Sequence, residues 1–454
     1  MDFEMMVNSQ RDYFNTDNTR SIDFRKNSLE KLYEAICENE VLIYSALKKD
    51  LGKSEHEAYM TEVGIVKEAL RQTIKKLESW AKPVKVWTPI YLFPGKSRII
   101  KEPYGVVLII SHWNYPILLS FMPLISAIAA GNCVILKPSK SSPVTSGIVA
   151  DIINGIYDKK HIYAIDESLP YDAILRQKYD YIFYSGSERV GKSILRYATE
   201  NMTPVTLEMG GKNPCIVDQT ADIDMAAHKI MWGKILNAGQ SANAPDYVLV
   251  HDSVKESFID ALRQYSKELV GDPFNNEDYP HIVTLHHYMR LKNCIAREKS
   301  VIGGRGDDKR LIIEPTIIPE ATYDSTIMKS EIFGPILPVI SYNDYDLMLS
   351  ELKARPKPLA LYLFSENDNF IKYVMEKISF GGGCVNDVML HIMNENLPYG
   401  GVGNSGMGKY RGKAGFDLFT HEKSIYLVPG SHDINQRYQP YKESALAFLR
   451  RIFK

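Results

Sequence analysis

The sequence contains few cysteines, and they are widely spaced. The five residues, Cys37, Cys133, Cys215, Cys294 and Cys384, are an odd number and include no CxxC pair. This spacing argues against a disulfide framework and against a structural zinc site, and it is typical of proteins from a reducing compartment. We therefore expect no metal centre.

The sequence also lacks a charge excess and long apolar runs. Its formal net charge of -1 gives no electrostatic footprint for nucleic acid or an anionic membrane. No run approaches the ~18–20 apolar residues that a membrane span needs, and the N-terminus has neither the basic region nor the apolar region of a signal peptide. We expect a soluble cytoplasmic protein with no nucleic-acid partner and no stable membrane anchor.

Strands and helices alternate along most of the 454 residues, of which 45% are hydrophobic. From residue 103 onward, apolar runs that read as buried parallel strands lie at 105–110, 132–136 and 179–184, and each is followed by a polar turn. The second half alternates again, with strands expected at 214–217, 247–250, 311–318 and 359–364. The pattern predicts an α/β fold with ligands at the carboxyl ends of the strands.

Other segments have a different character. Residues 1–80 read as amphipathic packing helices, and 82–102 read as a β-hairpin because prolines, aromatics and β-branched residues alternate there. The glycine-rich segment 397–415 is too long for a simple turn, so we expect it to contact something. The chain ends in a short amphipathic segment at 446–454, for which packing is favoured over membrane contact.

The stretch 206–247 carries the most specific signal. It sets Glu208 beside a double glycine and ends in the turn Asn-Ala-Gly-Gln-Ser-Ala-Asn-Ala-Pro. This stretch strongly resembles the active-site segment of the aldehyde dehydrogenase superfamily, and its sequence is most similar to that of the short, class 3-like (fatty aldehyde dehydrogenase-like) branch. In that family the turn reads Gly-Gln-x-Cys, and the cysteine is the nucleophile. Here the cysteine position is Ala242.

The resemblance implies a Rossmann-like cofactor domain, a second α/β catalytic domain and a small β oligomerisation element that builds a homodimer. On this reading the NAD(P)-binding domain spans 1–80 and 103–207, and the catalytic domain spans 208–423. The oligomerisation element comprises 81–102 and 424–430, and 431–454 form a C-terminal tail.

The resemblance also implies the chemistry. A thiolate adds to an aldehyde, hydride leaves for the nicotinamide, and water releases the acid. Asn114, in the motif Trp-Asn-Tyr-Pro, would be an oxyanion-hole donor together with the backbone N–H of residue 242. Glu208 would take a proton from water. Its apolar and glycine surroundings predict partial burial, which would raise its pKa toward neutrality.

Two turns are expected to hold the adenosine and pyrophosphate parts of the cofactor. Lys137-Pro-Ser-Lys140 matches the family's Lys-Pro-x-Glu turn except at its last residue. A carboxylate there would repel a 2′-phosphate and Lys140 would attract it, so we hypothesise that NADP binds at least as well as NAD. A surface lysine pointing to water is the alternative. The spacing of Gly186, Ser187 and Gly191 fits equally well a plain strand-to-helix turn, and the resemblance implies pyrophosphate contact there.

Further positions follow from the resemblance alone. In Glu-Ile-Phe-Gly-Pro, Glu331 would contact the nicotinamide ribose and Phe333 would pack near the ring, with Trp113 on the cofactor side. Three residues are assigned to the substrate wall: Tyr115, Asn386 and Tyr399. The aromatics near the site favour an apolar aldehyde.

Ala242 can neither add to a carbonyl nor leave from it, so the chain as written is expected to be inactive. Ser241 has no evident base, and Cys215 reads as a small core residue. The cysteine was either replaced deliberately to trap a complex or lost in a natural inactive relative. Replacement is favoured, because the other site residues are retained. Two rivals are a non-catalytic NAD(P)- or aldehyde-binding protein and a CoA-linked acyl reductase, and Glu208 argues against the latter.

Overall fold

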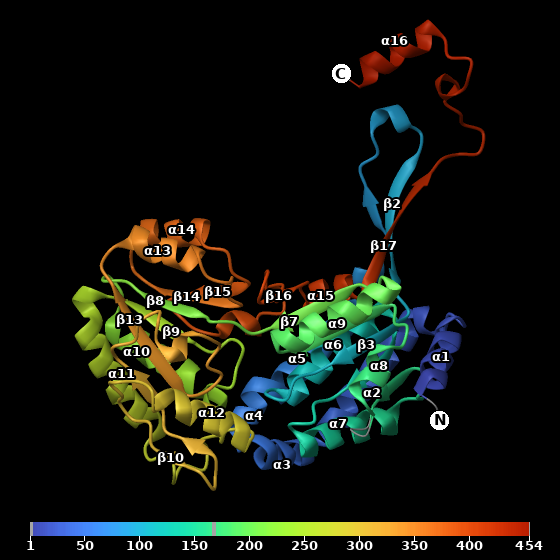
Figure 1. Cartoon of the computed structure of the whole chain (residues 1–454). Coiled ribbons are helices and arrows are strands. Elements are labelled where there is room, and N and C mark those ends of the chain that lie inside the picture. The colour runs from blue at the N-terminus through green and yellow to red at the C-terminus, as the bar shows by residue number, and fades with distance from the viewer. Residues whose placement is uncertain (1–2, 166–168, 454) are drawn as a thin grey trace.

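The computed structural model describes residues 3–165 and 169–453; residues 1–2, 166–168 and 454, which the predicted domain ranges include, lie outside the described residues. Two six-stranded sheets lie side by side, each flanked by helices, and a three-stranded sheet projects away from them (Figure 1). The predicted α/β fold with two sheet domains and a small β element is confirmed.

The first sheet is parallel except at one edge, where β16 runs antiparallel to β7. Its strands, in spatial order, are β16 (Gly406–Met407), β7 (Val205–Met209), β6 (Tyr181–Gly186), β3 (Val106–Ile110), β4 (Cys133–Lys137) and β5 (Ile162–Ala164).

Both faces of this sheet are covered by helices, which explains the continuous apolar runs of its strands. On β3, Val107 and Ile109 face one core with α2, α5 and α6, whereas Val106, Leu108 and Ile110 face another with α1, α8 and α9. The side chains alternate because a strand has a two-residue period. The helices are α1 (Phe3–Phe14), α2 (Ile22–Glu38), α3 (Glu40–Leu51), α5 (Gly64–Ala81), α6 (Pro116–Ala130), α7 (Pro143–Ile156), α8 (Tyr171–Leu175) and α9 (Glu188–Asn201).

The second sheet is parallel at every strand pair. Its order is β12 (Thr316–Ile318), β13 (Ile336–Tyr342), β9 (Tyr247–His251), β8 (Pro214–Val217), β14 (Ala360–Phe364) and β15 (Gly382–Val385). One face packs on α12 (Leu285–Ile295), α13 (Tyr345–Lys353) and α14 (Asp368–Lys377), and the other packs on α10 (Ile223–Ile235) and α11 (Lys255–Val270).

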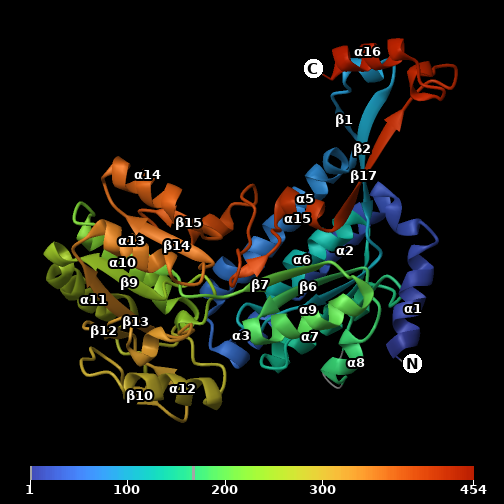
Figure 2. The same ribbon diagram turned by 45° about the horizontal axis from the view of Figure 1, so that its top comes forward.

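The projecting sheet is antiparallel and joins segments from distant parts of the chain. It consists of β1 (Val84–Val86), β2 (Lys96–Pro103) and β17 (Thr420–Leu427). The predicted hairpin at 82–102 is confirmed. The amphipathic C-terminal segment forms α16 (Glu443–Ile452), which lies across the end of the hairpin (Figure 2). There the rings of Tyr91 and Phe453 are 5.3 Å apart.

The predicted single strand at 311–318 is wrong. Leu311 has a left-handed φ of 57°, β11 (Ile312–Ile313) pairs with β10 (Gly306–Asp307), and only β12 joins the large sheet. Pro315 separates the two pieces, and a proline cannot donate a hydrogen bond to a strand ladder.

The predicted boundary between residues 207 and 208 divides a strand, because Glu208 lies within β7 of the first sheet. The chain also returns to that sheet late. β16 pairs with β7, and α15 (Gly412–Leu418) packs against α5 and α6. These contacts join residues that are roughly two hundred or more positions apart, so the local sequence pattern does not reveal them.

Asn132 ties the first sheet to the late segment and provides a test of the fold. Its buried side chain accepts from Gly105 N at 3.0 Å and donates to Phe419 O at 2.9 Å. We expect Asn132→Ala to lower the free energy of unfolding by about 1–3 kcal/mol or more, because buried backbone groups lose their partners. Denaturant titration measures this change. Asn396→Ala, in an exposed loop, is the control and should change stability by less than about 0.5 kcal/mol; equal effects would contradict the proposed anchoring.

Candidate active site

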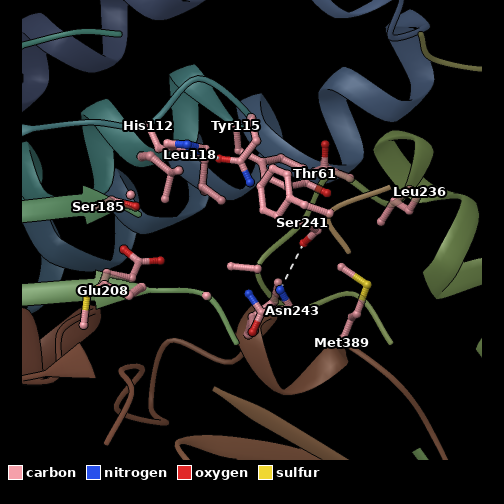
Figure 3. Close-up of a pocket in the computed structure, with 18 of the residues that line it drawn as sticks. Thr61, His112, Tyr115, Leu118, Ser185, Glu208, Leu236, Ser241, Asn243 and Met389 are labelled. Carbon is pink, nitrogen blue, oxygen red and sulfur yellow. Dashed lines mark hydrogen bonds between the residues drawn. The ribbon is translucent and has the colours of Figure 1, made fainter. Parts of the chain in front are cut away.

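A cavity of about 390 Å³ opens where loops from both large sheets meet. Its lining includes Asn114 after β3, Glu208 on β7, and Ala242, Glu331 and Phe333 from the second half of the chain. Figure 3 shows how the labelled side chains surround it. These residues, which the resemblance assigns to one active site, thus line the same cavity, and their roles in it stay predictions.

The loop that carries Ala242 has an uncommon backbone conformation. Three successive residues, Asn237, Ala238 and Gly239, have φ values of 51°, 50° and 72°. Left-handed φ is costly for alanine, and a Cβ at Gly239 would lie 2.2 Å from Gly334 O. The tight course of the loop leaves Ala242 half-buried on the cavity wall.

Two buried side chains fix this loop from outside. Glu57, on α4 (Glu55–Ala58), accepts from Asn237 N at 2.8 Å. Asn213 donates to Ala242 O at 2.7 Å. Burial raises the pKa of Glu57 to about 7, although the charge of Lys53 and the Asn237 amide favour its ionised form. The strained loop is thus held by specific hydrogen bonds.

Asn114 lies beside the same loop. Its Nδ2 donates to Gln240 O at 3.1 Å, and its Oδ1 lies 2.8 Å from His112 Nδ1. An amide carries two N–H donors, so one remains beyond the bond to Gln240. The side chain is 3% exposed, and its orientation is fixed by these partners. The placement is compatible with the predicted oxyanion role.

A buried ion pair supports Asn114 from behind. Lys53 and Glu62 are both fully buried, with Nζ and Oε1 2.6 Å apart. Lys53 also donates to Asn114 O at 3.1 Å and lies 3.9 Å from the ring centroid of Tyr115. Glu62 accepts hydrogen bonds from the backbone N–H groups of Ile117 and Leu118 at the start of α6, which otherwise would lack partners. The pair therefore fixes the turn between β3 and α6.

Glu208 is 6% exposed and accepts from the Tyr410 hydroxyl at 2.9 Å. Burial raises its pKa, while the charge of Arg411 and the hydroxyls of Tyr410 and Tyr399 favour the carboxylate. The predicted direction of the shift is confirmed. A carboxylate whose pKa lies above its usual range is better matched to proton transfer near neutral pH.

Glu331 and Phe333 lie on the opposite loop. Glu331 accepts from Gly211 N at 3.2 Å, and a Cβ at Gly210 would lie 2.1 Å from its Oε1, so the double glycine makes room for this carboxyl. Burial, together with the charge of Asp246, raises the pKa of Glu331 to about 8. Phe333 has φ 51° and makes edge contacts with Trp113, at 5.4 Å between centroids.

The predicted adenosine turn follows β4. Lys137 is 3% exposed and donates to Pro138 O at 2.9 Å, whereas Lys140 is exposed. Exposure of Lys140 is compatible both with phosphate contact and with a surface lysine. The choice between NAD and NADP therefore stays a prediction.

The predicted pyrophosphate turn follows β6. Gly186 has φ 154°, and a Cβ there would lie 2.3 Å from the Tyr184 hydroxyl. Ser187 precedes α9, and its side chain does not cap the helix. Gly191 packs so closely on β7 that a Cβ would lie 2.9 Å from Met209 Sδ. Gly186 and Ser187 line the cavity, so the amides of the α9 N-terminus adjoin it.

Of the predicted substrate-wall residues, Tyr115 and Tyr399 line the cavity. Asn386 does not belong to the lining. Its amide instead accepts from Ser365 N at 2.9 Å and donates to Ser365 O at 3.1 Å, which joins β15 to the end of β14. The assignment of Asn386 to the wall is corrected on this ground. Cys215 is fully buried in β8, as predicted for a core residue.

Sequence reasoning missed several residues that surround the site. His112 lines the cavity, and burial lowers its pKa to about 4, so the ring is neutral at physiological pH. Lys53, Glu57 and Arg411 were also missed. Charged residues are seldom buried without a partner, and no local pattern signalled that these would be. Only their positions in space connect them with the site.

Two general properties complete the description. Among the described residues, no helix is both long and apolar enough to cross a membrane. The same part of the chain contains no group of three or more His, Cys, Asp or Glu side chains arranged to hold a metal ion.

Two Rossmann-like sheets with polar loops converging on one cavity define a protein of the doubly wound α/β class, in which ligands bind beyond the carboxyl ends of the strands. Residues 1–425 match the Aldehyde dehydrogenase family. The chain therefore belongs to the aldehyde dehydrogenase family.

Individual relatives agree with this assignment over nearly the full length. The 4,4'-diaponeurosporen-aldehyde dehydrogenase of Staphylococcus aureus is 46% identical over 446 residues, 97% of each chain. The dimeric NADP-preferring aldehyde dehydrogenase of Canis lupus familiaris is 40% identical over 439 residues, 96% of this chain and 97% of that protein. Relatives from Dictyostelium discoideum and Mus musculus carry the designation family 3, in line with the class 3-like resemblance.

Solved structures give the same result. The substrate-bound state of Staphylococcus aureus AldH superposes with a TM-score of 0.97 at 45% identity, covering 100% of this chain and 99% of that one. The NAD+ complex of betaine aldehyde dehydrogenase from Staphylococcus aureus has a TM-score of 0.84 at 24% identity, over 96% and 88% of the two chains, and shows the shared fold.

The buried Lys53–Glu62 pair gives the second prediction. Lys53→Met leaves a carboxylate buried without its cation, and we expect a loss of about 3–5 kcal/mol in the free energy of unfolding. The double variant Lys53→Met/Glu62→Gln should lose less than the sum of the single losses, because it removes both charges. Denaturant unfolding of the three variants measures this coupling. Additive losses would show that the two side chains act independently.

Proposed function

We propose that this chain is the scaffold of an NAD(P)+-dependent aldehyde dehydrogenase that converts an apolar aldehyde to a carboxylic acid, and that Ala242 occupies the position of the cysteine nucleophile. One observation carries the proposal: Ala242, Glu208 and Asn114 line the same cavity. As written, the chain lacks the thiol and is inactive. Retention of this surrounding geometry favours a deliberate replacement over natural loss.

Each residue then has a defined task. A thiolate at position 242 forms a bond to the carbonyl carbon, and the oxygen gains negative charge. The free N–H of the Asn114 amide and the backbone N–H of residue 242 are the donors for that oxygen. After oxidation to the thioester, Glu208 accepts a proton from water as the water oxygen bonds to the carbon. The carbon–sulfur bond breaks, and the acid leaves.

The residues around the cavity fit a dinucleotide. The glycine at 186, the exposed start of α9 and the buried Lys137 at the end of β4 form a surface for phosphate and ribose groups. The Glu331 carboxyl, held beside Gly210 by the amide of Gly211, lines the cavity and would accept hydrogen bonds from ribose hydroxyls. A bound nicotinamide supplies the hydride acceptor. Trp113 and Phe333 would wall the ring side of the pocket.

The substrate proposal rests on the lining of the cavity. Besides the polar groups described above, side chains without hydrogen-bonding capacity dominate, among them Met60, Ile65, Leu118, Leu119, Leu236, Met389, Ile392 and Met393. Such a lining favours an apolar aldehyde. One similar Staphylococcus aureus protein is named for 4,4'-diaponeurosporen-aldehyde, which is compatible with this substrate class.

We further propose a homodimer built through the projecting sheet. Its hairpin carries large exposed apolar side chains, including Trp87 at 82%, Ile90 at 86% and Phe93 at 74% exposure. Exposed apolar clusters mark interaction surfaces, and two relatives are named as dimeric.

The five cysteines are free, which supports a reducing compartment such as the cytoplasm. The predicted domain division is proposed with β7, β16 and α15 assigned to the cofactor domain.

Restoring the thiol gives the third prediction. Ala242→Cys should gain NAD(P)+-dependent oxidation of long-chain or aromatic aldehydes, whereas the chain as written should show none; absorbance of NAD(P)H measures both. Ala242→Ser is the matched control, since a hydroxyl without a base should stay inactive. A non-catalytic binding protein predicts no activity in either variant, and that result would reject the dehydrogenase.

The role of Glu208 distinguishes the proposed dehydrogenase from a CoA-linked acyl reductase. In the Ala242→Cys background, Glu208→Gln should lower turnover about 10²–10⁴-fold, because the general base is lost. A CoA-linked acyl reductase predicts tolerance of this change and turnover that depends on CoA.

The fourth prediction concerns the choice between NAD+ and NADP+, and it can be tested by binding to the inactive chain. In the chain as written, Lys140→Glu should weaken NADP+ relative to NAD+ by about 10-fold or more, because a carboxylate repels the 2′-phosphate that the ammonium attracts. Calorimetric dissociation constants for both cofactors measure the change. Lys160→Glu controls for surface charge. An unchanged ratio of the NADP+ and NAD+ dissociation constants would show that Lys140 is a surface lysine that does not contact the cofactor.

A further inference from the structure

Arg411 combines features that its position in the sequence does not explain. It lies in the turn before α15, at φ 80° and ψ 142°, in the region that favours glycine. It is nevertheless 2% exposed and lines the cavity. A charged, non-glycine residue held both in a strained conformation and out of water points to a role at the site.

The guanidinium packs on two tyrosines. Its central carbon lies 4.8 Å from the ring centroid of Tyr399 and 6.0 Å from that of Tyr410. It also donates to Ile392 O, and its Nε has no hydrogen-bond partner among the described residues. A flat guanidinium can stack on aromatic rings in this way and remains charged when buried.

The two tyrosines connect Arg411 to Glu208. Tyr399 and Tyr410 are paired through both of their backbone groups, at 3.0 and 2.8 Å. Tyr410 donates to Glu208 Oε2 at 2.9 Å. The Tyr399 hydroxyl accepts from Asn243 Nδ2 at 2.8 Å, which leaves its own proton free for another acceptor. The hydroxyls that surround the carboxylate are thus held by residues in contact with Arg411.

The positive charge of Arg411 also favours the ionised form of Glu208. Among the influences that favour the ionised form of Glu208, the positive charge of Arg411 is the largest, and it opposes the effect of burial. Burial also raises the pKa of Glu395, and Arg411 again opposes this shift. The positive charge of Arg411 therefore acts on two carboxyl groups, the half-buried Glu395 and the buried Glu208, which lines the cavity.

We propose that Arg411 is a positioning residue for Glu208: its buried guanidinium holds the rings of Tyr399 and Tyr410 and stabilises the Glu208 carboxylate. The functional meaning rests on the proposed function, in which Glu208 accepts a proton from water. Without Arg411, only the hydroxyls of Tyr410 and Tyr399 would oppose the effect of burial, and the pKa of the Glu208 carboxyl would rise further above its usual range. The strained backbone of Arg411 places its guanidinium against the rings of Tyr399 and Tyr410.

The test uses the chain as written and does not depend on turnover. Glutamate labelled with ¹³C at Cδ reports the ionisation of Glu208 by NMR, and the resonance is identified by its loss in Glu208→Gln. Arg411→Gln removes the positive charge, so the carboxylate becomes less favoured and the midpoint of its titration should move upward by about one pH unit. Arg411→Lys keeps a charge and should restore much of the midpoint.

Arg411→Met is a second neutral variant, whose long unbranched side chain can pack against Tyr399 if glutamine prevents folding; its midpoint should also rise. Midpoints that stay unchanged or fall in the folded neutral variants would overturn the proposal, as would equal shifts in the lysine and glutamine variants. In the Ala242→Cys background, the acidic limb of the rate profile should move with the NMR midpoint while the KM for cofactor stays constant. A midpoint shift in a protein that Ala242→Cys leaves inactive would uphold the role of Arg411 and reject the dehydrogenase.

Discussion

The left-handed backbone at 237–239 is the constraint on which the site depends. It turns the chain sharply after α10 and brings residue 242 to the cavity wall. This conformation is unfavourable in isolation, and it persists because Glu57 and Asn213 hold its amide and carbonyl groups. The place of residue 242 on the cavity wall is thus set by backbone geometry and by these two hydrogen bonds.

Buried charge is the second organising feature. Lys53, Glu62, Glu57 and Arg411 are removed from water around a largely apolar cavity. Burial of charge is costly unless partners compensate it, and each of these groups has a backbone, aromatic or ionic partner that also fixes a part of the site. The same contacts that satisfy the charges hold Asn114, the 237–242 loop and Glu208 in place.

The chain crosses between its two sheets more often than a simple two-domain division suggests. Glu208 lies on β7 of the first sheet, and the late segment with Tyr399, Tyr410 and Arg411 returns to that sheet through β16 and α15. The cavity is therefore assembled from many separate segments, which lie between Met60 and Arg411 in the sequence. Movement of one sheet relative to the other would separate Asn114, the proposed oxyanion donor, from the loop that carries residue 242.

The sequence alone determined the α/β class, most strands, the hairpin and the family, because apolar periodicity and ordered motifs are local properties of the chain. It also singled out Glu208 and Asn114, since each lies in a distinctive short motif. The placement of Asn386 and the late return of β16 were decided only by the tertiary structure, as were the roles of Lys53, Glu57 and Arg411. These depend on contacts between residues far apart in sequence, and burial of a charge becomes acceptable only when folding supplies its partner.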